Sequence, residues 1–349
     1  MSPTPTPPVT VRAVAKACGI SQTTVSLALR NSPKTSVATR ERVQAKASEM
    51  GYAVDANVSK LMGYLRRRRK ERSLCNLGWI YHGEKQAWKK PWNRDILESA
   101  KERAAELGYA LEEIWVSAPD FNLAKLPHLL RSRGIEGILL PTPDPKVAPI
   151  HKYLSWEELQ VVVLMAPASL PEFNHVDFHH TDNMKMAITE ALRLGYRRPG
   201  LFIGRWSDNN SNWSYSGQIM AEHGHYLDYV HVPPFWTEGW HGELWNEREF
   251  IKWYKREKPD VLLVVGNEWK SRVEASGVKV PHDVGMLHLQ WGPDVKEWAG
   301  IDPQRKHIGH SAVDLLTAGL VRGEKGIPLF AKEMQIRGVW KMGNTLQKR

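Results

Sequence analysis

The stretch VRAVAKACGISQTTVSLALR at residues 11–30 has the pattern of two short helices joined by a tight turn. Gly19 stands where such a turn needs a residue that tolerates a positive φ. Ser21 can cap the second helix, and Val25 and Ala28 fall three residues apart on its inner face. This pattern predicts a helix-turn-helix, a motif whose second helix enters the DNA major groove.

The predicted second helix carries polar residues on its outer side, namely Gln22, Thr23, Ser26 and Arg30. The surrounding charge has the sign that DNA phosphates attract: residues 1–72 hold 14 Lys and Arg against 4 Asp and Glu, a net charge of +10. The remainder holds 34 of each type, so this segment carries all of the excess. Such a footprint indicates phosphate binding. A basic unfolded tail would lack the apolar periodicity of residues 11–50.

A third helix is expected at VATRERVQAKASEMG, capped by Ser36 and ended by Gly51. Its inward residues are expected to be Val37, Val43, Ala47 and Met50. The following segment ends in the basic run RRRRK, and residues 66–69 are predicted to contact phosphates. A merely solvated charge run is the alternative interpretation.

The rest of the sequence excludes several classes of protein and of site. There is no run of 18 apolar residues, so no membrane-spanning helix is expected. The first eight residues, MSPTPTPP, lack the features of a signal peptide and are expected to be a flexible leader. Cys18 and Cys75 are the only cysteines, which excludes a disulfide framework and a zinc site with four cysteine ligands. The expected location is the cytoplasm, in association with the nucleoid.

Strands and helices alternate after residue 73, which predicts βα units with parallel sheets covered on both faces. Strands are expected at residues 77–81, 110–116, 137–140, 161–165, 201–204, 261–265, 284–289 and 335–340, and helices at 96–107, 123–133, 184–194, 247–258 and 308–322. Two such series suggest two α/β lobes. In these folds ligands bind beyond the carboxyl ends of the strands, here between the lobes.

Residues 9–52 resemble, without a gap, the DNA-binding headpiece of the lactose-repressor (LacI/GalR) family of bacterial transcription regulators. Weaker resemblance continues through ERAAELGY (102–109), RGIEGILLP (133–141), TDNMKMAITEALRLGYRRPGL (181–201), KPDVLLVV (258–265), GVKVPHDVGM (277–286) and IGHSAVDLL (308–316). The resemblance implies an all-α helix-turn-helix headpiece followed by a two-lobed α/β core that resembles periplasmic binding proteins and has parallel sheets. It also implies a homodimeric repressor, bound to double-stranded operator DNA, whose affinity a small effector such as a sugar alters.

The domain limits expected from this resemblance are a leader at residues 1–8, the headpiece at 9–53, a hinge helix and basic linker at 54–72, and the core at 73–349. Lobe 1 is expected at 73–177 and 301–328, and lobe 2 at 178–300 and 329–349. The three crossovers between lobes would lie near Phe178, Gly300 and Pro328.

Site residues are assigned from the same patterns and resemblance. Leu61 matches the hinge-helix leucine that the family inserts into the minor groove. The expected DNA-binding residues are Arg12, Ser21, Gln22, Thr23, Thr24, Ser26, Leu27, Arg30, Asn31, Leu61, Arg66 and Arg67. The expected effector-binding residues are Tyr81, Asn212, Trp213, Trp236, Asn267, Gln290 and Asp302.

The expected effector pocket departs from the pattern of the family that the chain resembles. Asn212 stands where many members have an arginine and Gln290 where many have an aspartate. Neutral amides suit a neutral polyol, and aromatic faces such as those of Trp213 and Trp236 can stack on a sugar ring. The alternative is that these tryptophans pack core or interface surface.

Other classes fit less well. The segment HVDFHHTD at residues 175–182 would place His175, Asp177 and His179 on one face of a strand, which permits a metal site. The resemblance instead puts this segment at a crossover, and neither a metal nor a cofactor is expected. A transport protein with the same core would lack the headpiece. An enzyme would need a catalytic constellation, and the sequence shows none of the phosphate-loop, dinucleotide or nucleophile-elbow motifs.

Overall fold

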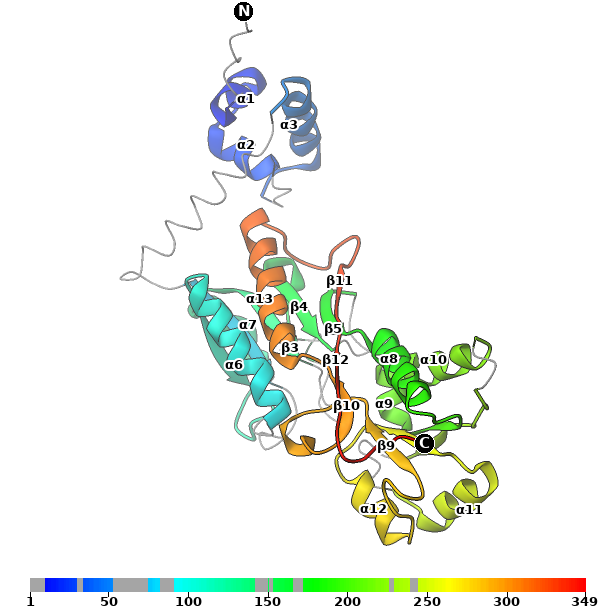
Figure 1. The fold of residues 1–349 in the computed structure, drawn as a ribbon. Coiled ribbons are helices and arrows are strands. Elements are labelled where there is room, and N and C mark those ends of the chain that lie inside the picture. The colour runs from blue at the N-terminus through cyan, green and yellow to red at the C-terminus, as the bar shows by residue number, and fades with distance from the viewer. Residues whose placement is uncertain are drawn as a thin grey trace, which may run out of the picture.

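The computed structural model describes residues 10–29, 34–52, 75–81, 91–141, 150, 153–165, 172–225, 229–238 and 244–349, and Figure 1 shows their arrangement. The expected leader (1–8) and the whole of the expected hinge helix and basic linker (54–72) lie outside these described residues. None of the helices in the described part combines the length and apolarity that a membrane crossing requires.

The headpiece consists of three helices, α1 (Val11–Cys18), α2 (Gln22–Leu29) and α3 (Val37–Glu49). Gly19 ends α1 with a left-handed φ of 66°, which confirms the predicted turn. Side-chain oxygens begin each helix: those of Thr10, Ser21 and Ser36 accept hydrogen bonds from backbone N–H groups in the first turn. Six buried residues form the core, namely Val14, Ala15, Val25, Ala28, Val43 and Ala47.

The expectation that Val37 faces inward is wrong, because its side chain is 59% exposed. Val37 is the first residue of α3, directly after the capping Ser36. The helix reaches the core only further along, at Val43 and Ala47.

Lobe 1 contains a parallel six-stranded sheet in the order β11-β5-β4-β3-β1-β2. Its strands are β1 (Cys75–Tyr81), β2 (Tyr109–Trp115), β3 (Ile135–Pro141), β4 (Gln160–Leu164), β5 (Asn174–Phe178) and β11 (Glu333–Ile336). The helices α6 (Pro91–Glu106) and α13 (Arg305–Arg322) pack side by side over one face. The other face is covered by α7 (Leu126–Ser132), preceded by the short η1 (Leu123–Lys125), and by η3 (Trp156–Glu158).

Lobe 2 contains a second sheet in the order β12-β10-β9-β8-β6-β7, parallel except for the antiparallel β12. Its strands are β6 (Pro199–Gly204), β7 (Phe235–Thr237), β8 (Val261–Val264), β9 (Gly285–His288), β10 (Ala299–Asp302) and β12 (Val339–Lys341). Helices α8 (His180–Arg193) and α10 (Ser214–His223) pack on one face. Helices α11 (Glu247–Glu257) and α12 (Trp269–Ala275) pack on the other, and α9 (Arg205–Asn210) and η4 (Pro293–Val295) complete the lobe.

The chain passes three times between the two sheets. The first passage follows β5, near the expected Phe178. The second lies between β10 and α13, after Asp302, because β10 pairs with β9 and so belongs to lobe 2 beyond the expected boundary at Gly300. The expected third passage near Pro328 is likewise too early, since β11 pairs with β5 in lobe 1.

The prediction of a single strand at 335–340 is therefore wrong. The segment forms β11 in one sheet and β12 in the other, with the third passage between them. Gly338 lies in this passage, where an added Cβ would come within 2.8 Å of Asn183 Oδ1 and 2.9 Å of Asp302 O. The strands β5, β7 and β10 and the helices α9, α10 and α12 were not expected, because they are short or carry mixed polar sequences.

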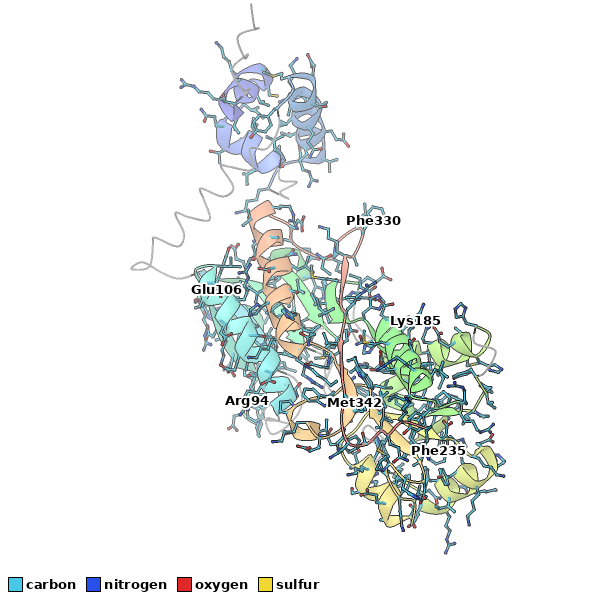
Figure 2. All side chains as sticks on the ribbon, in the orientation of Figure 1. Arg94, Glu106, Lys185, Phe235, Phe330 and Met342 are labelled. Carbon is cyan, nitrogen blue, oxygen red and sulfur yellow. The ribbon has the colours of Figure 1, made fainter. Side chains whose placement is uncertain are left out.

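The connection from α13 to β11 presents large apolar side chains to solvent. Leu329 is 89% exposed and Phe330 is 81% exposed, and Figure 2 shows Phe330 projecting from the end of this lobe.

Candidate DNA-binding and effector sites

The outer side of α2 presents the predicted base-reading residues. Gln22 and Thr23 are exposed. The hydroxyls of Ser21 and Thr24 lie 2.8 Å apart, and Ser21 Oγ accepts from Thr24 N at 3.1 Å, so both serve the helix cap. Leu27 is half-buried.

The other assigned DNA-binding residues are placed less completely. Arg12 is exposed on α1. The positions Arg30, Asn31, Leu61, Arg66 and Arg67 lie outside the described residues, as does the side chain of Ser26.

The assigned effector residues follow the carboxyl ends of strands, at the edges where the chain passes between lobes. Tyr81 ends β1 and Asp302 ends β10, while Asn267 and Gln290 come shortly after β8 and β9. Because all these strands are parallel within their sheets, their carboxyl ends meet along one edge of each sheet. Figure 1 shows one of these passages, the chain that runs from β11 in lobe 1 to β12 in lobe 2.

Asp208 organises one side of the site in lobe 2. Its carboxylate is fully buried and accepts from Trp236 Nε1 at 3.1 Å and from Ser216 N at 3.1 Å. Its backbone oxygen accepts from Trp213 N at 2.8 Å. Asp208 therefore joins α9, α10 and β7, and it links two of the assigned residues. Sequence reasoning missed it, since nothing in the local pattern marks a buried acid.

The turn held by Asp208 has an unusual backbone. Asn212 and Trp213 adopt left-handed φ values of 55° and 58°, which costs non-glycine residues about 1–3 kcal/mol each. Trp213 is nevertheless 42% exposed. A strained turn that displays an aromatic ring at the edge of a sheet is typical of a ligand-binding loop.

We expect Asp208→Asn to destabilise this turn by about 1–3 kcal/mol, because an amide has one acceptor oxygen where the carboxylate has two. One of the two N–H donors, Ser216 N or Trp236 Nε1, would then face an NH₂ group. Urea denaturation of the variant measures the loss. Asn209→Ala, an exposed change on the same helix, is the control, and equal stability of the two variants would contradict the assigned role.

A row of polar contacts runs from lobe 1 into lobe 2 beside the first passage. Asp177 Oδ1 lies 3.4 Å from His180 Nε2, and His180 Nδ1 lies 2.8 Å from the hydroxyl of Tyr215. Gln290 Nε2 donates to the same hydroxyl at 3.2 Å. Tyr215 is buried, and burial raises the pKa of its hydroxyl above the ordinary value. These contacts connect Gln290, through Tyr215 and His180, to Asp177 in the lobe 1 strand β5.

The remaining assigned residues are separate. The Tyr81 hydroxyl donates to the carboxylate of Glu113 on β2. Asn267 is exposed. Asp302 accepts from Gln304 N at 3.0 Å, and its other oxygen lies 3.7 Å from Lys341 Nζ. The structure thus links Trp213 and Trp236 through Asp208, with Asn212 directly before Trp213 in the same turn, and it bonds Gln290 to Tyr215.

His288 is a buried titratable group beside Gln290. Its ring nitrogens lie 3.3 Å from Gly266 N and 3.1 Å from Gln290 N. Burial first, and then the positive charge of Arg305, lower the pKa of His288 to about 3. The folded protein therefore holds this imidazole neutral.

His288 should make the protein acid-sensitive. Between pH about 6.5 and 3 the unfolded chain binds more protons than the folded one, so the free energy of unfolding falls as the pH drops through this range. His288→Gln should flatten this dependence in urea denaturation between pH about 7 and 4.5. The exposed His128→Gln is the control, and identical slopes for the two variants would contradict the prediction.

The metal interpretation of residues 175–182 gains no support. His175 and His179 lie near separate acids, with His175 Nε2 3.3 Å from Glu333 Oε1 and His179 Nε2 3.5 Å from Asp182 Oδ2. Within the residues that the structure describes, no group of three His, Cys, Asp or Glu side chains is arranged to hold a metal ion.

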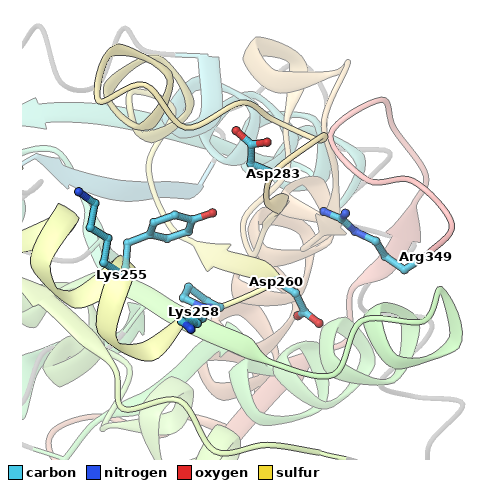
Figure 3. Close-up of a pocket in the computed structure, with 7 residues that line it drawn as sticks. Lys255, Lys258, Asp260, Asp283 and Arg349 are labelled. Atoms are coloured by element: carbon cyan, nitrogen blue, oxygen red, sulfur yellow. The ribbon is translucent and has the colours of Figure 1, made fainter.

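A pocket of about 470 Å³ lies elsewhere in lobe 2 (Figure 3). Asp260 and Asp283 in its lining precede β8 and β9. The pocket therefore lies at the amino ends of these strands, opposite the edge that faces lobe 1. Asp260 is occupied by the backbone, accepting from Arg197 N at 2.6 Å and Arg198 N at 2.9 Å. This pocket is distinct from the assigned effector residues.

Two family models match the chain. Residues 10–55 match the model described as bacterial regulatory proteins of the lacI family. Residues 76–233 match the model for periplasmic binding proteins and the sugar-binding domain of the LacI family. Together the two matches cover more than half of the chain, and they follow one another in the order of headpiece and core.

Curated relatives and solved structures point the same way. The sucrose operon repressor of Escherichia coli is 24% identical over 297 residues, covering 78% of this chain and 81% of that protein. The lactose operon repressor of E. coli strain K12 is 23% identical, covering 60% of this chain and 55% of that protein. Among structures, the CelR–cellobiose complex matches with a TM-score of 0.62 at 17% identity, covering 97% of this chain and 99% of that one.

A helix-turn-helix headpiece and a two-lobed α/β core define a DNA-binding transcription regulator rather than an enzyme. The chain belongs to the LacI family of bacterial regulatory proteins.

Proposed function

We propose that the protein represses transcription by binding a specific operator, and that a small effector bound between the lobes changes this affinity. The main observation is that α2 begins with two exposed polar residues, Gln22 and Thr23, and that the assigned polar residues of the core gather at the carboxyl ends of its strands. The sucrose and lactose operon repressors support this assignment. The cellobiose complex of CelR supports a carbohydrate-like effector.

The proposed DNA-reading side chains are those that the structure leaves exposed on α2. Gln22 can bond bidentately to adenine, and the Thr23 methyl can contact a thymine. Thr24, with Ser21, holds the helix start in position. A homodimer would present two such helices to a near-palindromic site, and Leu61 of each hinge would insert between base steps in the minor groove.

Gln22→Ala should change the preferred base at one position in each half-site, at a cost of about 1–3 kcal/mol. Because Gln22 is exposed, the fold should be unaffected. Selection of binding sites from random DNA by the wild type and the variant measures the change. The same consensus from both proteins would contradict the assignment of Gln22.

The effector is proposed to lie against Trp213, Trp236 and Gln290, with Asn212 and Asn267 bonding its polar groups. A thermal-shift screen of the full chain against sugars and sugar derivatives tests this, since a ligand that binds the native state raises stability by mass action. Each ligand found is then added to a DNA-binding assay. Binding that leaves operator affinity unchanged would contradict the regulatory role.

A further inference from the structure

Arg305 is a buried charge beside the proposed effector site. It is the first residue of α13, and its side chain is 9% exposed. Its Nη1 donates to Trp291 O at 2.5 Å and its Nη2 to Gln290 O at 2.7 Å. Its buried Nε has no hydrogen-bond partner among the described residues. Both acceptors are uncharged carbonyls in the loop that follows β9.

No carboxylate in the described part of the chain forms an ion pair with this guanidinium. Asp302, Asp95 and Asp294 influence it only through space. Asp302, the largest of these influences, is bonded instead to Gln304 N and lies near Lys341. A buried charge without a directly bonded counter-charge is costly, and burial lowers the pKa of Arg305 accordingly.

The surroundings of Arg305 favour negative charge. It stands at the amino end of an 18-residue helix, where backbone N–H groups and the helix dipole attract anions. The ammonium of Lys341 lies 5.5 Å from the ring centroid of Trp291, one of the two residues that Arg305 contacts. The neighbouring Gln290 and the more distant Asn212 and Asn267 are neutral amides.

We propose that the effector of this protein is anionic, a small polyol that carries a phosphate or a carboxylate, and that Arg305 and the amino end of α13 bind this group. The amide side chains then bond the hydroxyls. This inference rests on the proposed function, and it narrows the effector from carbohydrates in general to their acidic derivatives. Arg305 would exchange one or both carbonyl contacts for charge-assisted bonds to the ligand oxygens, which are stronger.

The test uses matched sets of probes: glucose, glucose 6-phosphate and glucuronate, the corresponding galactose compounds, and sucrose with sucrose 6-phosphate. Isothermal titration of the full chain gives the affinity of each. An acidic member should bind at least tenfold more tightly than its neutral parent. Arg305→Gln should lower the affinity for the acidic ligand by about 10- to 100-fold, the range for loss of a charged hydrogen bond. The affinity for the neutral parent sugar should change little.

Lys306→Gln is the matched control, because it removes one positive charge from the same helix turn at an exposed position. Its effect on the acidic ligand should be under about threefold, as expected for an exposed charge. Arg305→Lys, which keeps the charge but loses the planar fork, should retain part of the affinity. The melting temperature of each variant is also measured without ligand, which shows whether a loss of binding reflects a loss of folding.

The outcomes separate the inference from the proposed function. Tight binding of neutral sugars, with acidic members no better, would overturn the inference and leave the function standing. Equal binding of the acidic ligand by wild type and Arg305→Gln would overturn the role of Arg305. If Arg305→Gln does not fold, the role of Arg305 is tested by the affinity of Arg305→Lys for the acidic ligand. The preference of the wild type for acidic over neutral members of each matched set then tests the class of effector. If the wild type binds neither the acidic nor the neutral sugars, the result would count against the proposed effector site itself.

Discussion

Gly309→Ala should destabilise the core by about 3 kcal/mol, a cost at the upper end of those for overpacking. Gly309 lies where α13 crosses α6. An added Cβ would lie 2.8 Å from Ala100 N and closer still to Ile96 O and to Ser99 Oγ. Two of these three atoms belong to the backbone of α6, so the two helices must move apart. Because both helices cover the same face of the lobe 1 sheet, the sheet would lose buried contacts as well.

Gly217→Ala provides the matched control. Gly217 also lies within a helix, α10, but an added Cβ would meet nothing within 4 Å. The same substitution should there stabilise the protein by about 0.5–1 kcal/mol, because alanine favours the helix more than glycine does. Urea denaturation of both variants measures the difference. Similar free energies of unfolding would show that α6 and α13 tolerate a wider separation than their packing indicates.

The headpiece could be predicted closely because its signals are local. The left-handed turn at Gly19 and the caps at Ser21 and Ser36 depend on neighbours within four residues. The inner residues Val25 and Ala28 follow from helical spacing alone. The prediction for Val37 was wrong because it extended the helical spacing back to the first residue of α3. At that position the side chain is exposed, and α3 contacts the core only from later residues.

The core was predicted in its alternation of strands and helices but not in its boundaries. The sequence predicts one strand at residues 335–340, yet β11 pairs with β5 and β12 pairs with β10. Which sheet a strand joins depends on residues more than 150 positions away in the first case. Such pairing cannot be seen in local periodicity.

The effector site shows the same division. Gln290 was assigned by its resemblance to a family position, and the structure places it beside Tyr215. Asp208 and Arg305 were missed. Both look like ordinary surface charges in the sequence, and only their burial in the fold distinguishes them.

Val43→Asp should abolish DNA binding while leaving the core intact. Val43 is fully buried among the six residues that form the headpiece core. Burial of a carboxylate without a partner costs several kcal/mol, which exceeds what so small a core can supply. The headpiece should therefore unfold, and affinity for DNA selected by the wild type should fall by more than about 100-fold, equivalent to roughly 3 kcal/mol. Ligand binding by the core should not change.

Val37→Asp is the control for this prediction, since it makes the same substitution in the same helix. Val37 is exposed at the first position of α3, where an acidic side chain interacts favourably with the helix dipole. This variant should keep a folded headpiece, with DNA affinity lowered only by the effect of one added charge. Hydrogen exchange of the headpiece amides distinguishes the two cases: protection should be lost in Val43→Asp and kept in Val37→Asp. If the amides stay protected in Val43→Asp, the headpiece does not depend on this core. If protection is lost in both variants, α3 is less stable than its cap and packing indicate.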